Sequence, residues 1–163
     1  MDQFHNEDGL NIHEQTLGPE IWKQTNGKVN AFCTSIGSGG TFAGVARYLK
    51  RKNPAIKCIA VEPRDGAILS KGYVKNPAHM IQGTGYGIVP PHWDPSLCDE
   101  IITVSDKEAR EMTIRLSHEE GTYVGYSSGA NVNAAMKYLN REMNNKINMV
   151  TILCDVAYKY SDL

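Results

Sequence analysis

Apolar, β-prone segments alternate with helical segments along most of this chain, and short glycine-rich or polar junctions separate them. Residues 29–36 and 57–61 have the composition of buried strands, and residues 41–52 between them carry apolar side chains at helical spacing. This alternation predicts parallel strands, because a parallel strand is reached through a crossover helix. We therefore expect an α/β fold: a parallel twisted sheet with helices on both faces, in three αβα layers.

The remainder of the chain continues the same alternation. Further strands are predicted at residues 101–104, 122–126 and 149–153, and further helices at 20–24, 106–120 and 130–143. Ser105 and Glu108 have the spacing of a capping box before the helix at 106–120, and Gly121 would end that helix. Residues 64–100 form a long glycine- and proline-containing loop between short helical pieces, which is typical of a functional loop.

Length and charge limit the functions that are open to the chain. Its 163 residues correspond to about one domain. Seventeen basic and eighteen acidic residues give a net charge of −1, so we expect no nucleic-acid partner, which would need a concentrated basic field. The sequence shows no apolar run of the roughly eighteen residues that span a membrane and no signal peptide. Its four cysteines are far apart without a CxxC pair, which predicts a reducing, cytoplasmic location.

The first junction with a chemical pattern joins the strand at 29–36 to the helix at 41–52. It reads Gly37-Ser38-Gly39-Gly40-Thr41. Glycines let backbone N–H groups approach a ligand, and a helix N-terminus favours an anion, so the pattern predicts a phosphate cradle. It lacks the lysine ending of a P-loop. Two alternatives stay open: a plain glycine turn, and a dinucleotide site in which Glu62, about twenty residues onward, binds a ribose.

Two later segments also lie where ligands bind in such sheets, beyond the carboxyl ends of strands. Ser127-Ser128-Gly129 is predicted as a tight turn between a strand and a helix, and it is either a simple N-cap or part of a ligand site. The glycine-rich run at residues 82–87 is either a flexible surface loop or a cover over a substrate.

Taken in this order and spacing, the three segments resemble the fold-type II pyridoxal-phosphate enzymes. The resemblance is strongest to cysteine synthase (O-acetylserine sulfhydrylase), with cystathionine β-synthase next, and it covers nearly the whole chain. Further segments that carry it are Asp2-Gln3-Phe4, Gly18-Pro19-Glu20-Ile21-Trp22, Gly27-Lys28-Val29, Val61-Glu62-Pro63 and Val124-Gly125.

The resemblance implies a cofactor and a role for each segment. The cofactor would be pyridoxal 5′-phosphate, and its phosphate would be held by Gly37, Ser38, Gly39, Gly40 and Thr41. Ser127 would hydrogen-bond the pyridine nitrogen, and Gly83, Gly85 and Tyr86 would belong to the substrate loop. A tyrosine at position 86 is more similar to the cystathionine β-synthase version. The family reaction replaces the acetate of O-acetyl-L-serine with sulfide and gives L-cysteine.

The sequence also departs from the family pattern. The family uses a Schiff-base lysine in a Ser-x-Lys-like motif, and no lysine here has that context, so we assign no catalytic residue. The resemblance then implies that residues 1–163 are a truncated large domain whose N-terminal part is absent. Where the family has Asp-Ser-Gly-x-Arg-Tyr, this chain has Val156 and Lys159 in place of the serine and the arginine.

These departures set the functional expectation. We expect the chain to be inactive by itself, and a non-catalytic regulatory or binding role stays open. The partners that the resemblance implies are a small amino-acid substrate, a second copy in a homodimer, or serine acetyltransferase.

Overall fold

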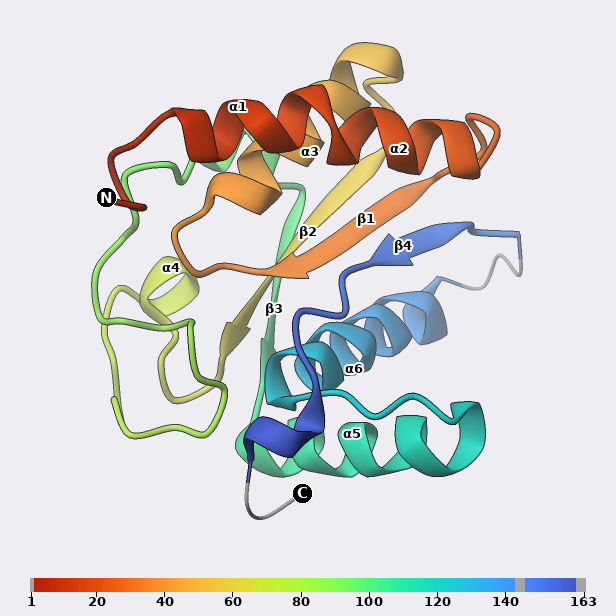
Figure 1. Cartoon of the computed structure of the whole chain (residues 1–163). Helices are drawn as coiled ribbons and strands as arrows, with labels where there is room; N and C mark the ends of the chain where they lie inside the picture. The colour runs from red at the N-terminus through yellow and green to blue at the C-terminus, as the bar shows by residue number, and fades with distance from the viewer. Residues whose placement is uncertain (1, 143–145, 161–163) are drawn as a thin grey trace.

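A parallel sheet lies between two layers of helices in the computed structural model, which describes residues 2–142 and 146–160 (Figure 1). Over these ranges the sheet has four strands in the order β3-β2-β1-β4. All three pairings between neighbouring strands are parallel. The strands are β1 (Ala31–Ser35), β2 (Lys57–Pro63), β3 (Glu100–Val104) and β4 (Met149–Thr151).

The longer helices cover both faces of this sheet, which confirms the predicted three-layer α/β fold. Figure 1 shows α1 (Asp8–Gln15), α2 (Leu17–Gln24) and α3 (Gly40–Lys52) on one face. It shows α5 (Asp106–Glu120) and α6 (Tyr126–Arg141) on the other. A one-turn helix, α4 (Ile68–Lys71), and 3-10 turns at Pro95–Leu97 and Ala157–Lys159 complete the elements. No helix within the described ranges is both long and apolar enough to cross a membrane.

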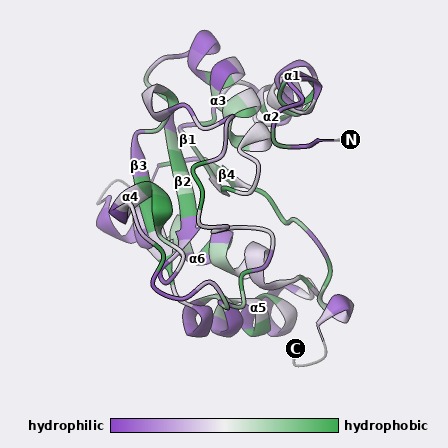
Figure 2. Ribbon diagram, turned by 90° about the vertical axis from the view of Figure 1, so that its left-hand side faces the viewer, coloured by the Kyte–Doolittle hydropathy of each residue, from purple (hydrophilic) through white to green (hydrophobic). Residues whose placement is uncertain are grey.

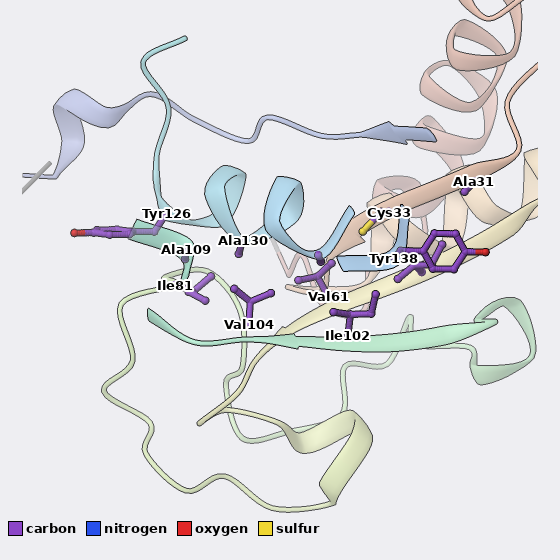
Figure 3. Packing of buried hydrophobic residues seen from close by; sticks show 12 residues of the cluster. Ala31, Cys33, Val61, Ile81, Ile102, Val104, Ala109, Tyr126, Ala130 and Tyr138 are labelled. Carbon is purple, nitrogen blue, oxygen red and sulfur yellow. The ribbon is translucent and has the colours of Figure 1, made fainter. Parts of the chain in front are cut away.

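Two apolar clusters hold the layers together, one on each face of the sheet. Because successive side chains of a strand point to opposite faces, β1 sends Phe32 toward α3 and Cys33 toward α6. Figure 3 shows the cluster on the side of α6, in which Val61 and Val104 from the strands lie opposite Ala130. Figure 2 shows the hydrophobic colour concentrated on the strands, as expected for a sheet buried on both faces.

The region before α6 differs from the sequence prediction. Residues 122–126 form no strand of the sheet, and only Val124 makes an isolated antiparallel bridge, to Val156. Helix α6 begins at Tyr126, four residues earlier than predicted, so Ser127-Ser128-Gly129 is the first turn of a helix and not a tight turn. The predicted last residue of this helix, Met143, lies outside the described residues.

Helix α1 is an element that the apolar pattern does not predict. Leu10 is its only buried residue, so it lacks the apolar stripe of a typical surface helix. It packs instead through a close backbone approach to α3, where a Cβ on Gly44 would overlap the Leu10 carbonyl oxygen. This contact places α1 beside the N-terminal half of α3, which forms part of the site described next.

Candidate functional site

The first wall of the site is the glycine turn between β1 and α3. Gly39 has φ +89° and is the N-cap of α3, and no side chain caps this end of the helix. A Cβ on Gly37 would lie 2.6 Å from the Gly83 carbonyl oxygen, so the absence of a side chain lets the two loops meet. The Ser38 hydroxyl accepts a long hydrogen bond from the Gly40 N–H, 3.4 Å from nitrogen to oxygen. Apart from this long bond, the positive end of the helix has no side-chain cap.

The second wall is the N-terminus of α6, which comes from the opposite face of the sheet (Figure 1). Its N-cap is Gly125, again without a side-chain cap. Ser127 is buried and lines the cavity, whereas the Ser128 hydroxyl accepts a hydrogen bond from the Cys154 N–H at 2.8 Å. Asn131 donates from its side-chain amide to the Ile152 carbonyl at 2.8 Å. These bonds fix the start of α6 against the segment that follows β4.

Between these walls lies a cavity of about 330 Å³, beyond the carboxyl ends of β1 and β4. This volume lies within the usual range for small-molecule sites. Six of the predicted site residues line it: Gly37, Ser38, Gly39, Thr41, Gly83 and Ser127. The other lining residues are Thr34, Ser35, Phe42, Gln82, Thr84, Ile152, Cys154, Asp155 and Tyr160. The structure thus brings together the three segments that the sequence analysis singled out.

Three predicted site residues do not line this cavity. Gly40 faces α1, where a Cβ would lie 3.3 Å from the Gly9 carbonyl oxygen. Gly85 and Tyr86 border a separate small cavity on the other side of the loop. The Tyr86 ring is half exposed and packs edge-on against Phe4, with ring centroids 5.6 Å apart.

The segment after β4 supplies two lining residues, Asp155 and Tyr160, that the sequence analysis did not assign to the site. The Tyr160 hydroxyl donates to Asp155 Oδ2 at 3.0 Å. Burial, together with this hydrogen bond and the Asp155 charge, raises the pKa of Tyr160 to about 12, so the phenol stays protonated at neutral pH. Asp155 lies four residues after β4, beyond the carboxyl ends of the strands, and that position is the signal that could have identified it.

Thr41 connects the cavity to α1. Its hydroxyl lies 3.1 Å from Nε2 of His13. Burial lowers the pKa of His13, which favours the neutral imidazole at this contact. The α1 helix therefore helps to orient a hydroxyl at the first turn of α3.

Glu62, which the dinucleotide alternative requires, has a structural role. Its side chain is 2% exposed. The two carboxylate oxygens accept hydrogen bonds from the Leu69 and Ser70 N–H groups, each at 2.9 Å. Both oxygens therefore bind the start of α4. The Glu62 carboxylate is not available to bind the ribose of a dinucleotide.

Chemically, the cavity combines an anion site at the N-terminus of α3 with a separate hydrogen-bonding group, the Ser127 hydroxyl at the N-terminus of α6. The open N-terminus of α3 suits a phosphate, and the buried Ser127 hydroxyl can bond a ring nitrogen. None of the residues that line the cavity is a lysine. The site therefore fits a phosphorylated aromatic ligand.

Comparisons with known proteins agree with this chemistry. The family model described as "Pyridoxal-phosphate dependent enzyme" matches residues 1–155. Cysteine synthase 3 of Caenorhabditis elegans is 44% identical over 160 residues, which are 98% of this chain and 47% of that protein. The O-acetylserine dependent cystathionine beta-synthase of Bacillus subtilis is 39% identical over 158 residues, which are 97% of this chain and 50% of that protein.

The solved structures give the same result for the fold. The crystal structure of O-acetyl serine sulfhydrylase isoform 3 from Entamoeba histolytica superposes with a TM-score of 0.93 at 34% sequence identity. The match covers 99% of this chain and 47% of that one. The chain thus spans about half the length of the relatives that it matches.

Proposed function

Because this chain belongs to the family of pyridoxal-phosphate dependent enzymes, we propose that the cavity between the N-termini of α3 and α6 binds pyridoxal 5′-phosphate. One observation carries the proposal: two helix N-termini without side-chain caps, on opposite faces of the sheet, border the same cavity. In this proposal the backbone N–H groups and hydroxyls of Gly37, Ser38, Gly39, Gly40 and Thr41 hold the phosphate.

Ser127 is the proposed partner of the pyridine nitrogen. A neutral hydroxyl donates to an unprotonated ring nitrogen, whereas a carboxylate would favour the protonated ring. The bound cofactor would act as an electron sink for carbanion chemistry at the substrate. The unprotonated ring makes this sink moderate, which suits elimination and replacement at the β-carbon of an amino acid.

The reaction that we propose for this site is the replacement of the acetate of O-acetyl-L-serine by sulfide, giving L-cysteine. The similarity to cysteine synthase supports this substrate class. In the site, the loop containing Gly83 and Gly85 would cover the amino acid, because Gly83 already contacts the turn at Gly37. Asp155 and Tyr160 would close the cavity on the side of β4.

We propose further that this chain by itself does not complete the reaction. The chemistry requires an amine that carries the cofactor and moves the α-proton, and no residue lining the cavity is a lysine. The expected behaviour is therefore reversible, non-covalent cofactor binding without turnover.

The test uses the purified chain with pyridoxal phosphate and with pyridoxine 5′-phosphate, which lacks the aldehyde. We expect saturable binding of both ligands and no L-cysteine from O-acetyl-L-serine and sulfide. A Ser127→Ala variant should bind both ligands more weakly, and a Ser117→Ala variant on the far part of α5 serves as a matched control. Failure of the wild type to bind either ligand would refute the cofactor site, and L-cysteine formation would refute the inactivity.

A second candidate is the chemistry of cystathionine β-synthase, in which a thiol amino acid replaces sulfide. The presence of Tyr86 in the loop and the similarity to the Bacillus subtilis protein favour it. The two candidates differ in the size of the product that the site accommodates. Greater thermal stabilisation of the cofactor-loaded chain by L-cystathionine than by L-cysteine would support the second candidate.

A third candidate is a non-catalytic binding role, favoured by the cavity lining without a lysine. In that role the chain would dock with a second copy, with a longer member of its family, or with serine acetyltransferase. Co-purification of purified partners with the chain tests this role, and the absence of any complex would count against it.

A further inference from the structure

A second cavity, of about 180 Å³, lies on the outer side of the glycine turn and is lined largely by charged and polar groups. It is bordered by the start of α1, by one face of α3 and by residues 91–94. Figure 1 shows the green segment around residue 90 passing beside the N-terminal end of α1. Its lining residues are Glu7, Leu10, Asn11, Arg47, Pro91, His92, Trp93 and Asp94.

Opposite charges face this cavity without neutralising each other. Glu7 and Arg47 both line it, yet no ion pair joins them or connects either to another residue in the described ranges. A guanidinium binds a carboxylate through two parallel hydrogen bonds, and a carboxylate binds an ammonium group through charge-assisted bonds. The cavity therefore has both charges that a small zwitterion needs, on Arg47 of α3 and on Glu7 at the N-cap of α1. A third charged residue, Asp94, also lines it and accepts hydrogen bonds from the Ser96 N–H and hydroxyl.

His92 provides an independent observation at the same place. It is 9% exposed, lines the cavity, and its buried Nε2 has no hydrogen-bond partner among the described residues. A buried imidazole nitrogen without a partner costs free energy, and because this nitrogen is closed to solvent, a ligand in the cavity recovers that cost only if the His92 ring turns toward it. The Asn11 side chain, which also borders the cavity, can donate and accept a hydrogen bond.

From these groups we infer that the second cavity binds a small α-amino acid, with its carboxylate on Arg47 and its ammonium on Glu7. A cavity of about 180 Å³ is smaller than the usual range for drug-sized ligands, which agrees with a ligand of this size. This site is separate from the one proposed above for the cofactor and its substrate.

The second site shares structural supports with the glycine turn. A Cβ on Gly39 would lie 3.2 Å from the His92 backbone and side chain, so the turn rests directly on His92. Trp93 of the second cavity packs against Phe42 of the first, with ring centroids 5.5 Å apart. An amino acid that orders His92 and Trp93 therefore also orders the turn that faces the first cavity, and the two ligands should strengthen each other's binding.

Trp93 gives a readout that needs no enzymatic activity. The chain has two tryptophans, so a Trp22→Phe background isolates the emission of Trp93. We would titrate this chain, residues 1–163 and free of cofactor, with L-alanine. Parallel titrations use propionate and ethylamine, which each carry one of the two charges. The expected result is a saturable emission change with L-alanine, and responses at least about tenfold weaker with the two single-charge compounds.

Substitutions locate the response. Arg47→Gln and Glu7→Gln should each weaken L-alanine binding about tenfold or more. Arg51→Gln is the matched control, because Arg51 lies one turn further along α3 and pairs with Glu14 away from the cavity. No saturable response to L-alanine, equal responses to the single-charge compounds, or unchanged binding by Arg47→Gln would each overturn the site.

The coupling is measured with pyridoxine 5′-phosphate, which cannot react with the amino acid. Saturating L-alanine should tighten its binding by about fivefold or more. An unchanged affinity would overturn the coupling. If pyridoxine 5′-phosphate does not bind at all, the proposed cofactor site fails, and the Trp93 titration still decides the second site independently.

Discussion

Helix α5 and the helices α3 and α6 begin in opposite ways. At α5, the Ser105 hydroxyl accepts from the Glu108 N–H at 3.3 Å, and the Glu108 carboxylate accepts from the Ser105 N–H at 2.8 Å, so the helix end is closed by its own sequence. At α3 and α6 the N-cap residue is a glycine, which has no side chain to cap the first turn. Both open ends border the same cavity, and α5 does not.

The start of α5 therefore contributes to the stability of the fold, whereas the starts of α3 and α6 are available for ligand binding. A serine N-cap contributes about 1 kcal/mol to helix stability, which α5 receives in full and the other two helices do not. The unused N–H groups of α3 and α6 are instead available to a ligand. The comparison predicts that substitutions at the three helix starts will affect different quantities.

The largest effect is expected where the start of α6 packs on α5. A Cβ on Gly129 would overlap Thr113 Oγ1 and the Ala109 carbonyl oxygen, and the backbone cannot move away cheaply. Gly129→Ala should therefore lower the free energy of unfolding by about 3 kcal/mol, measured by urea denaturation. Gly9→Ala in α1 is the control, because no atom lies within 4 Å of its added Cβ. A loss below about 1 kcal/mol for Gly129→Ala would contradict the close packing.

At α3 the expected effect is on binding. A Cβ on Gly37 would lie 2.6 Å from the Gly83 carbonyl oxygen and would push the two cavity loops apart. Gly37→Ala should weaken the binding of pyridoxal phosphate at least about tenfold, equivalent to about 1.4 kcal/mol, in a fluorescence titration. The same titration of Ser105→Ala should give the wild-type affinity. Equal affinities for Gly37→Ala and the wild type would show that the turn does not shape the site.

The same contrast explains which parts could be predicted from the sequence. Helix α5 is predicted almost to the residue, because its capping box and its terminal glycine act within a few residues of the chain. The start of α6 is not predicted, because it depends on contacts distant in sequence, such as Ser128 with Cys154. Residues 122–126 have the composition of a strand, yet they pair only through an isolated bridge between Val124 and Val156, outside the sheet, so tertiary structure overrides local propensity.

In the site, too, features that depend on neighbouring residues are predictable, and features that depend on contacts distant in sequence are not. The glycine turn at 37–41 is visible in the sequence because a strand, a glycine run and a helix follow one another directly. The contribution of Tyr160 is not visible, since it reaches the cavity only because β4 pairs with β1. Tyr86, which the sequence assigns to the substrate loop, borders another cavity together with Gly85, and Gly85 and Gly87 on either side of it have positive φ angles.

A smaller effect, on pH dependence, is expected at the closed end of α5. Burial would raise the pKa of Glu108, but the Ser105 N–H, Lys137 and the Ser105 hydroxyl outweigh it and lower the pKa to about 2. A carboxyl with a lowered pKa stabilises the fold fully above its unfolded value of about 4.5, and this contribution is lost as the pH falls toward 2. Allowing for solvent screening, this loss should be about 1–2 kcal/mol.

Urea denaturation between pH 6 and pH 2 measures this loss. The wild type should lose more stability over this interval than Glu108→Gln, which cannot change its charge. Parallel pH profiles for the two proteins would show that the capping carboxylate does not contribute through its charge.

The smallest effect is expected when the serine N-cap of α5 is exchanged for the glycine N-cap of α3 and α6. Ser105→Ala should cost about 1 kcal/mol of unfolding free energy, since the Glu108 N–H loses its acceptor. Ser105→Gly gives α5 the N-cap residue that α3 and α6 have, and it should cost only a few tenths of a kcal/mol. Neither substitution should change cofactor affinity, because Ser105 does not line the cavity. If Ser105→Gly lowers the free energy of unfolding as much as Ser105→Ala, a glycine N-cap stabilises a helix no better than alanine does. The stability that α3 and α6 forgo by starting at a glycine would then be correspondingly larger.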